Sequence, residues 1–317
     1  MNKRSPFAGS SVYVVGNINR DVKLHDVAES AGLLRDGETS VSKISETIGG
    51  GGANSACAAA ALGARVHFFG KVGGDPLAEH LRKVLEGHGV RARLARDKQC
   101  ATGTSVALGF DSGHRHFLSC LPNNRTLRFE DIDVAAMDRC GHLLRADVWF
   151  SQSMLETGND RLFSEARKRG LKTSLDINFD PVWSTGSSHE IRRRKGLLRK
   201  VLGLVDLAHG NVRELREFTD CADLKSALKR LASWGVGAVV VHLGEKGAGY
   251  YHNGELIVEP ADRSVGAVHS TGTGDVLSIC MILLEANKRL SLRQKLRISN
   301  RVVREFMEGR RRLIPLL

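Results

Sequence analysis

The sequence predicts an α/β protein with a mostly parallel, doubly wound sheet flanked by helices and a small β-sheet that projects from one edge. Short β-branched segments alternate with longer helical patterns along most of the chain, which is typical of a parallel sheet covered on both faces. Two segments, 22–47 and 102–120, interrupt this alternation. The length of 317 residues fits one large α/β domain, 1–317, that carries these two segments as an insertion.

In the first half of the chain, strands are predicted at 12–15 and 65–69, and helices at 52–62 and 76–87. Pro76 stands at the first position of its helix, where a missing N–H costs nothing. Residues 104–110 and 115–119 alternate in polarity around Asp111-Ser112-Gly113 and predict a hairpin. Together with 22–47, this hairpin is expected to form a lid that covers a site.

The alternation of strands and helices resumes in the second half of the chain. Strands are expected at 147–150, 172–176, 205–208 and 238–242, and the last two helices at 275–286 and 292–308. Asn253-Gly254 predicts a two-residue hairpin, because both residues readily adopt the left-handed backbone of a type I′ turn.

The composition indicates a soluble globular protein. Hydrophobic residues make up 42% and charged residues 26% of the chain, the ordinary range for globular proteins. The longest apolar run, 276–284, is well short of the ~20 residues that a membrane-spanning helix needs. The basic start of the chain lacks the apolar segment of a secretory signal, and dispersed cysteines are typical of reduced thiols. We therefore expect a cytoplasmic protein with no membrane partner.

The formal net charge of +12 raises the question of a nucleic-acid partner. Two basic runs stand out, 192–200 and 310–312. Neither contains the interleaved aromatic residues that stack on bases, so each is interpreted as a solvated helix face. We expect no nucleic-acid partner, and the surplus positive charge can help to attract anionic small molecules.

A glycine-rich loop before an apolar helix is the first candidate for chemistry. Gly272-Thr273-Gly274-Asp275 opens the helix at 275–286, and two glycines one residue apart let backbone N–H groups converge on an anion. A carboxylate here repels a phosphoryl group, but it suits a base that takes a proton from an attacking hydroxyl. The pattern also fits an ordinary aspartate at a helix N-terminus, and this segment alone leaves both interpretations open.

A second glycine-rich segment, Gly49-Gly50-Gly51-Gly52-Ala53-Asn54, opens the helix at 52–62. Successive glycines allow the backbone to approach a ligand closely. The segment does not match a dinucleotide-binding motif with its downstream acid, and the chain has no P-loop motif. The Asn54 amide, in the first turn after the glycines, suits hydrogen bonds to a polyol.

These segments, with Gly16-Asn17-Ile18-Asn19-Arg20-Asp21 after the first strand, resemble the ribokinase-like (PfkB-type) carbohydrate kinases. Gly49–Asn54 is similar to the first signature of that family, and Gly272–Asp275 is similar to the second. Three shorter motifs lie between them in the family's order: Gly73-Gly74-Asp75, Asn211-Val212-Arg213-Glu214 and Leu243-Gly244-Glu245-Lys246-Gly247. The resemblance covers 12–310 and implies in-line transfer of the ATP γ-phosphoryl group to a substrate hydroxyl.

The resemblance implies a role for each matching residue. Asp275 matches the general base, and the anion hole would consist of Gly272, Thr273 and Gly274. The residues implied to hold the substrate hydroxyls are Asn19, Asp21, Gly50, Gly51 and Asn54. The residues implied to bind ATP are Asn211, Glu214, His242, Gly244, Lys246, Gly247, Thr271 and Asn300. Asn211 and Glu214 would hold Mg²⁺ indirectly, partly through water, since Mg²⁺ dehydrates reluctantly.

Three positions depart from the family pattern. His269 stands where the second signature usually begins with aspartate, Thr273 replaces alanine, and Asp180 replaces an arginine in the stretch Asp176-Ile177-Asn178-Phe179-Asp180. Many relatives hold a monovalent cation through that aspartate, and an imidazole is a poor ligand for a hard cation. We therefore expect little activation by K⁺. The absent arginine argues against an anionic sugar.

The sequence leaves alternatives open for the identity of the substrate and of the partners. A sugar is expected as substrate, and a nucleoside is the alternative because both present a ribose-like diol. Phe110 and Phe117 are the aromatic residues near the lid that could stack on a base. A non-catalytic homologue that binds a sugar or a nucleotide is a further alternative. Two chains could also pair through the lid to form a homodimer.

Overall fold

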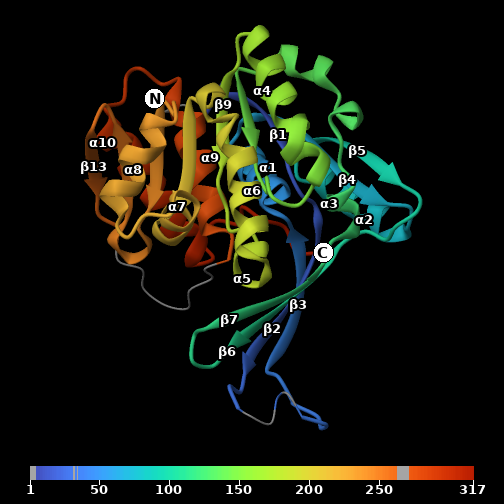
Figure 1. Ribbon diagram of the computed structural model, residues 1–317. Helices are drawn as coiled ribbons and strands as arrows, with labels where there is room; N and C mark the ends of the chain where they lie inside the picture. Colours follow the sequence, from blue (N-terminus) through green and yellow to red (C-terminus); the bar gives the residue numbers. More distant parts are fainter. Residues whose placement is uncertain (1–4, 31–32, 34, 263–270) are drawn as a thin grey trace.

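A computed structural model describes residues 5–30, 33, 35–262 and 271–317. A sheet with helices on both faces forms the main body, and a separate small sheet extends away from it (Figure 1). This arrangement confirms the predicted fold class. In the part of the chain that the structure describes, none of the helices has the length and apolar character needed to cross a bilayer.

The large sheet contains nine strands. In spatial order from one edge they are β13 (Glu255–Glu259), β12 (Ala248–His252), β11 (Ala238–His242), β10 (Leu207–Asn211), β9 (Lys172–Asp176), β8 (His142–Arg145), β1 (Ser11–Val15), β4 (Arg65–Gly73) and β5 (Arg91–Asp97). The strands from β11 to β5 pair in parallel, whereas β12 and β13 pair antiparallel to their neighbours. Asn253 and Gly254 join β12 to β13 with positive φ angles of 48° and 83°, as predicted for this hairpin.

The strand order reverses between β1 and β8. From β1 the chain adds β4 and β5 on one side, and β8, β9, β10 and β11 then follow on the other side. In open α/β sheets, ligands bind at the carboxyl ends of the strands beside such a reversal. The topology therefore places the expected site after β1 and β8.

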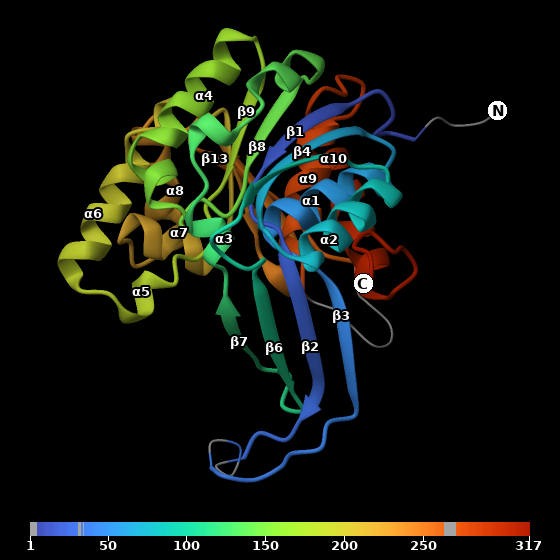
Figure 2. The same ribbon diagram turned by 90° about the vertical axis from the view of Figure 1, so that its right-hand side faces the viewer.

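Helices cover both faces of the large sheet (Figure 2). One face carries α1 (Gly51–Ala61), α2 (Pro76–Gly87), α9 (Thr273–Glu285) and α10 (Leu292–Met307), and the other carries α4 (Asn159–Lys168), α6 (Ser188–Arg199), α7 (Val212–Thr219) and α8 (Leu224–Ser233). Each face has its own apolar core. The side chains of α9 are buried from Val276 to Leu284, so this helix lies in the interior of the protein. Two short helices, α3 (Pro122–Arg125) and α5 (Val182–Thr185), lie in connections.

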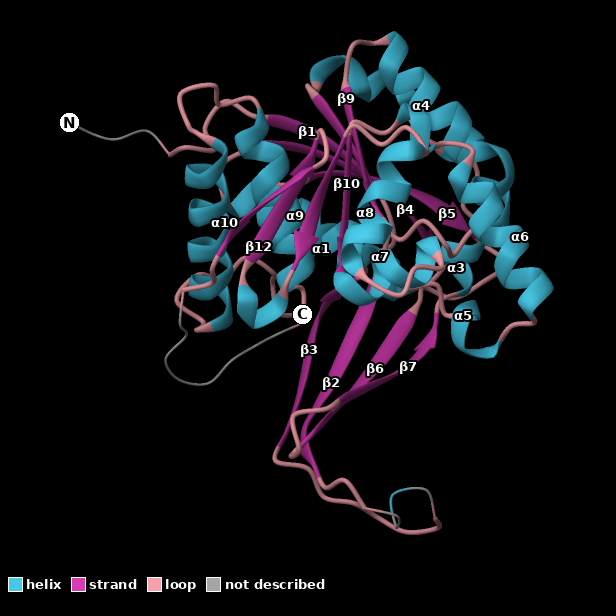
Figure 3. Ribbon diagram, turned by 60° about the vertical axis from the view of Figure 1, so that its left-hand side comes forward, coloured by secondary structure: helices cyan, strands magenta, loops and turns pink. Residues whose placement is uncertain are grey.

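The small sheet has four strands, in the order β3 (Lys43–Gly49), β2 (Asn19–Val27), β6 (Thr104–Phe110) and β7 (Arg115–Cys120). Figures 1 and 3 show it projecting from the carboxyl end of the large sheet. The segments 22–47 and 102–120, which interrupt the α/β alternation, supply most of these strands. Because β2 begins at Asn19 and β3 ends at Gly49, the base of the small sheet adjoins the end of β1 and the start of α1.

The predicted strand at 147–150 is wrong, and that at 205–208 is displaced. β8 occupies His142–Arg145, where all four side chains are buried despite two polar residues. Arg145 is accommodated because its Nε donates to Asn159 Oδ1 at 2.9 Å and its Nη1 donates to the carbonyl of Val15 at 3.3 Å. Burial lowers the pKa of Arg145 to about 10. Because His142 and Arg145 interrupt the apolar pattern of a buried strand, this strand was not predicted from the sequence.

The interpretation of the run 192–200 as a solvated face is wrong for two of its residues. The side chains of Arg194 and Lys195 are buried. Arg194 Nε donates to Asp180 Oδ2 at 2.6 Å, and Lys195 Nζ donates to Asp220 Oδ1 at 2.6 Å. Lys195 also lies 5.2 Å from the ring of Trp183, so the aromatic partner comes from elsewhere in the chain. Asp180 therefore forms a buried ion pair with Arg194. It stands at the position where the resemblance implies an arginine.

Candidate active site

Carboxylates from distant parts of the chain gather at the carboxyl end of the large sheet. Asp147 follows β8, Asp176 ends β9, Glu214 lies in the first turn of α7, and Asp275 lies in the first turn of α9. These groups are close enough to affect one another: the pKa of Asp176 is well above its usual range, chiefly through burial and then through Asp275, Glu214 and Asp147. The carboxyl groups at this end of the sheet therefore oppose one another's ionisation.

Asp275 lies in the first turn of α9, directly after the second glycine-rich segment. Gly272 precedes the helix with a positive φ of 85°, and α9 begins at Thr273. Asn54 Nδ2 donates a hydrogen bond to Asp275 Oδ2 at 2.9 Å, which joins the two glycine-rich segments. Burial raises the pKa of Asp275 to about 8; the Asn54 hydrogen bond opposes this shift, whereas the charges of Asp147, Glu214 and Asp21 add to it. A carboxyl with such a pKa exchanges protons near neutral pH.

The glycines before α1 permit close packing around the end of β1. A Cβ atom on Gly52 would lie 2.6 Å from Gly16 Cα, and one on Gly50 would lie 2.4 Å from the carbonyl oxygen of Asn17. Gly50 also has a positive φ of 91°, which other residues adopt at a cost. A Cβ on Gly51 would lie 3.0 Å from Asp147 Oδ1 and 3.3 Å from Asp275 Oδ1. The backbone of α1 therefore begins between two carboxylates.

Asp147 was not among the residues predicted from the sequence. Its side chain is 8% exposed, and its Oδ2 accepts hydrogen bonds from the backbone N–H groups of Asn17 at 2.9 Å and Gly52 at 2.8 Å. Its Oδ1 accepts from Gly51 N at 3.2 Å. One carboxylate thus satisfies the first free N–H groups of α1 and fixes the end of β1. The strand expected at 147–150 included Asp147. For this reason Asp147 was not predicted as a site residue.

Asn19 and Asp21 lie together at the base of the small sheet. Asn19 Nδ2 donates to Asp21 Oδ1 at 2.6 Å, and both side chains are buried. Burial raises the pKa of Asp21 to about 6, and Lys23 and Asn19 oppose the shift. In the strand register, Asp21 pairs with Thr47 on β3 and Ser105 on β6, and Ser105 pairs with Ser119 on β7. Paired residues share a face, so this row carries hydroxyl groups beside the Asp21 carboxylate.

A cavity of about 680 Å³ lies beside the N-terminus of α9. Six residues predicted for the anion hole or for ATP line it: His242, Gly244, Gly247, Thr273, Gly274 and Asn300. The amide Nδ2 of Asn300 donates to the carbonyls of Glu259 and Pro260 at 3.0 Å each, which fixes the chain after β13 against α10. The side chain of Leu277 supplies apolar surface to the same cavity. Its volume suits a ligand of nucleotide size.

Other residues predicted to bind ATP lie outside this cavity. Lys246 is exposed and is not among its lining residues. Thr271 Oγ1 accepts a hydrogen bond from Arg115 Nη1 of β7 at 2.9 Å, so it contacts the small sheet. His269, the predicted departure at the cation site, lies outside the described residues.

Asn211 and Glu214 form a reciprocal cap at the start of α7. Asn211 Oδ1 accepts from Glu214 N at 2.9 Å, and Glu214 Oε2 accepts from Asn211 N at 2.8 Å. Neither residue is among those that line the cavity. Burial raises the pKa of Glu214. Within the described ranges, no cluster of three or more His, Cys, Asp or Glu side chains is arranged to hold a metal ion.

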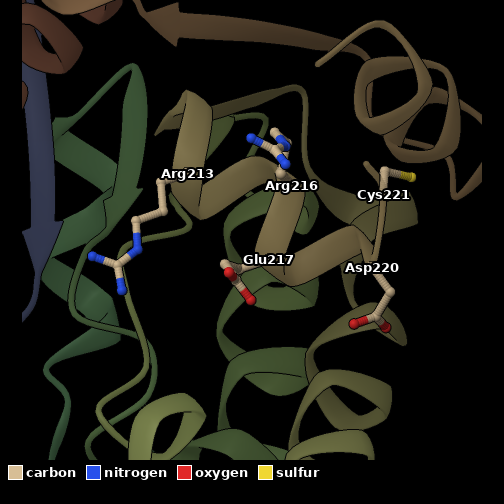
Figure 4. Close-up of a pocket in the computed structure, with 5 residues that line it drawn as sticks. All are labelled: Arg213, Arg216, Glu217, Asp220 and Cys221. Carbon is tan, nitrogen blue, oxygen red and sulfur yellow. The ribbon is translucent and has the colours of Figure 1, made fainter. Parts of the chain in front are cut away.

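A smaller hollow of about 170 Å³ lies along α7 and is lined by Arg213, Arg216, Glu217, Asp220 and Cys221 (Figure 4). Two of these side chains already have structural partners. The Arg213 guanidinium lies 4.5 Å from the ring centre of Phe179, and Asp220 pairs with Lys195. The hollow is too small for a nucleotide or a sugar with its hydration, and we assign it no role.

Comparisons with known proteins identify the family of the chain. The profile of the pfkB family carbohydrate kinases matches residues 10–278. A fructokinase from Vibrio alginolyticus is 28% identical over 254 residues, which cover 77% of each chain. A nucleoside kinase from Methanothermobacter thermautotrophicus is 28% identical over 244 residues, which cover 75% of this chain and 71% of that protein.

The fold comparison gives the same result. The crystal structure of a fructokinase with bound ATP from Xylella fastidiosa superposes with a TM-score of 0.77 at 19% identity, and covers 94% of this chain and 92% of that chain. The family match and the curated relatives confirm the expected phosphotransferase class, with an alcohol group as acceptor, and do not support the non-catalytic alternative. The chain belongs to the pfkB family of carbohydrate kinases.

Proposed function

We propose that this protein transfers the γ-phosphoryl group of ATP to a hydroxyl of an uncharged sugar. The observation that carries the proposal is the position of the N-terminus of α9. Thr273 and Gly274 line the 680 Å³ cavity, whereas Asp275 contacts Asn54 and is close enough to Asp21 to be affected by its charge. One helix start thus links a nucleotide-sized cavity to the hydroxyl-bearing face of the small sheet.

Asp275 would accept the proton of the attacking hydroxyl. Its raised pKa matches this task, because a base titrating near the working pH can both take up and release a proton. The hydrogen bond from Asn54 would hold the carboxylate in place. The N–H groups of Thr273 and Gly274, at the start of α9, would stabilise the charge on the transferred group, together with Gly272.

We expect the magnesium ion to be held chiefly by the ATP phosphates, because the described residues form no metal-binding cluster of their own. Burial raises the pKa of Asp176 and of Glu214, so a cation would relieve the cost of their negative charge. Glu214 and Asn211 would hold the ion indirectly through water. When bound, Mg²⁺ neutralises charge on the phosphates. We do not expect K⁺ to contribute strongly.

A sugar is the preferred acceptor because of the row formed by Thr47, Asp21, Ser105 and Ser119. Ser105 Oγ and Ser119 Oγ lie 2.5 Å apart, whereas Thr47 Oγ1 is buried and has no hydrogen-bond partner among the described residues. A buried hydroxyl without a partner is costly, and a polyol would satisfy it. Asn19, Gly50 and Gly51 would complete the polar surround.

A nucleoside remains the second candidate because of Phe117. This residue pairs with Ala107, which pairs with Lys23, so Phe117 lies on the same face as Asp21 and is 45% exposed. A ring in this position could stack on a base. Phe110 ends β6 and is only partly exposed.

The small sheet would act as a lid inserted in a single domain, and its other face would pair two chains. Ile44 of β3 is 62% exposed and Leu118 of β7 is 56% exposed; in the register they lie on the face opposite Asp21. Exposed apolar surface of this kind marks an interface. Light scattering of the purified protein would show a dimer, and Ile44→Lys with Leu118→Lys would yield monomers.

The proposed reaction is tested by an ATP-consumption screen over pentoses, hexoses, keto-deoxy acids and nucleosides. We expect acceptor-dependent ADP formation with a neutral pentose or hexose. Phe117→Ala then distinguishes the two candidates: a large rise in KM identifies stacking on a base, whereas an unchanged KM favours a free sugar. ADP formation with keto-deoxy acids alone would contradict the choice of an uncharged sugar.

A further inference from the structure

A second cavity lies at the amino ends of the central strands, at the opposite end of the large sheet from Asp275. Its volume is about 460 Å³, which is within the range of small-molecule sites. It is bounded by the first residues of β1, β4 and β5 and by the 3₁₀ segment Val134–Arg139 that precedes β8. The residues that matter for its chemistry are Ser11, Arg65, His67, Arg91, Arg139 and Cys140.

The cavity is strongly positive. Within the part of the chain that the structure describes, Arg65, Arg91 and Arg139 have no ion-pair partner. In contrast, Asp138, the acidic residue of the lining, is paired with Arg169 at 2.9 Å between its Oδ1 and the arginine Nε. Three guanidinium groups thus face one cavity with no carboxylate left to neutralise them. Their mutual repulsion costs free energy that a bound anion would recover.

His67 is the second, independent sign of a ligand. Its side chain is 7% exposed and lines the cavity, yet it makes no hydrogen bond to any described residue. Burial lowers the pKa of His67, and the charges of Arg91, Arg139, Arg93 and Arg65 lower it further. A neutral imidazole can still donate one N–H. The ring nitrogens are not among the fully buried polar atoms that lack a partner, so they stay accessible from the cavity, where a ligand oxygen would accept the N–H.

The strand register makes this cavity a rigid site. Arg65 pairs with Ser11 of β1, and His67 pairs with Arg91 of β5. Paired residues on neighbouring strands hold their side chains on one face. Groups that project from strands keep their spacing better than groups on loops, so Arg65, Arg91 and His67 are positioned before a ligand arrives, whereas Arg139 comes from the 3₁₀ segment before β8.

We propose that this cavity binds a small molecule that carries two phosphoryl groups. Guanidinium groups bind phosphate in a bidentate manner and are more weakly hydrated than ammonium groups. Three of them around a cavity much larger than one phosphate ion call for more than one anionic group. The proposal is independent of the kinase reaction, because the cavity lies at the other end of the strands.

The test uses the full chain and inorganic pyrophosphate as the probe, titrated by calorimetry without magnesium. Arg65→Gln with Arg91→Gln is compared with Arg192→Gln with Lys200→Gln, which removes the same charge from exposed positions on and after α6. We expect saturable binding that weakens at least about tenfold in the first pair, because each lost contact is charge-assisted, and less than twofold in the second. Absence of saturable binding to the unmodified protein, or an equal loss in both pairs, would overturn the proposal.

A second readout uses no arginine variant, so it does not depend on whether the arginine variants fold. The imidazole C2 proton of His67, assigned by its loss in His67→Gln, is followed by NMR as pyrophosphate is added. We expect its resonance to shift to saturation and the His67 pKa to rise, since an anion stabilises the imidazolium. A resonance that does not move would refute the site. A parallel titration with fructose 1,6-bisphosphate identifies the source of the phosphates: tighter binding than pyrophosphate indicates an organic ligand, and weaker binding indicates an inorganic one.

Discussion

The two ends of the nine-stranded sheet carry ionisable groups of opposite type, carboxyl groups at one end and guanidinium groups at the other. The carboxyl end gathers Asp147, Asp176, Glu214 and Asp275, whereas the amino end gathers arginines around His67. Under the proposals made above, the acidic end would need a cation before it accepted the phosphates of ATP, whereas the basic end would accept an anion directly. A net charge of +12 therefore says little about the sign of an individual site. The distribution of charge along the strands decides which ligand each end can hold.

The largest effect is expected at the acidic end from Asp275→Asn. This change should lower kcat by ~10² or more, because assistance by a general base is typically of that size, while the KM values for ATP and acceptor stay nearly constant. Steady-state kinetics on both substrates measures it, with Arg192→Gln as a surface control. Equal turnover in the variant would remove Asp275 from the role of base.

Asp147→Ala should chiefly affect stability. The carboxylate accepts three backbone N–H bonds, from Asn17, Gly51 and Gly52, and its loss leaves these donors unpaired. We expect a loss of about 3 kcal/mol in the free energy of unfolding, since each buried donor left without a partner costs ~1–3 kcal/mol. Urea denaturation measures the change. If the stability drops by less than ~0.5 kcal/mol, water or another group replaces Asp147, and its assignment as the anchor of α1 is wrong.

Asp21→Ala should have a smaller and different effect. The variant removes a partner of the substrate hydroxyls in both the ground state and the transition state, so KM for the acceptor should rise by about tenfold while kcat changes little. The KM for ATP serves as the internal control, because Asp21 is not among the residues that line the nucleotide-sized cavity. A change confined to kcat would place Asp21 in the chemical step and not in acceptor binding.

The order of strands and helices could be predicted from the sequence, because hydrophobic periodicity and the glycines at the ends of strands and helices are local signals. The helix Pro76–Gly87 and the strands Lys172–Asp176 and Ala238–His242 have the predicted bounds. The strand at His142–Arg145 could not be predicted, since its buried His142 and Arg145 are satisfied by residues distant in the chain. Its neighbours Val148 and Trp149 are apolar because they enter the core after the strand has ended.

The candidate site was predictable where a motif carries it, as at Asn54 and Asp275. It was not predictable where the tertiary structure creates it. Asp147 accepts hydrogen bonds from N–H groups of the loop after β1 and of α1, and the arginines of the basic cavity come from separate elements of the chain. The burial of Arg194 follows from Asp180, a pairing across 14 positions that no local pattern indicates.

The pH dependence of kcat/KM for the acceptor tests the role of Asp275 most directly. As the proposed base, Asp275 must be deprotonated to act, and burial raises its pKa in the free protein to about 8. We therefore expect kcat/KM to rise about tenfold per pH unit below this value and to level off above it. Asn54→Leu removes the hydrogen bond that favours the carboxylate, and should move the rising limb to higher pH. A profile that is flat from pH 6 to 9, or a limb that stays in place in Asn54→Leu, would contradict the account.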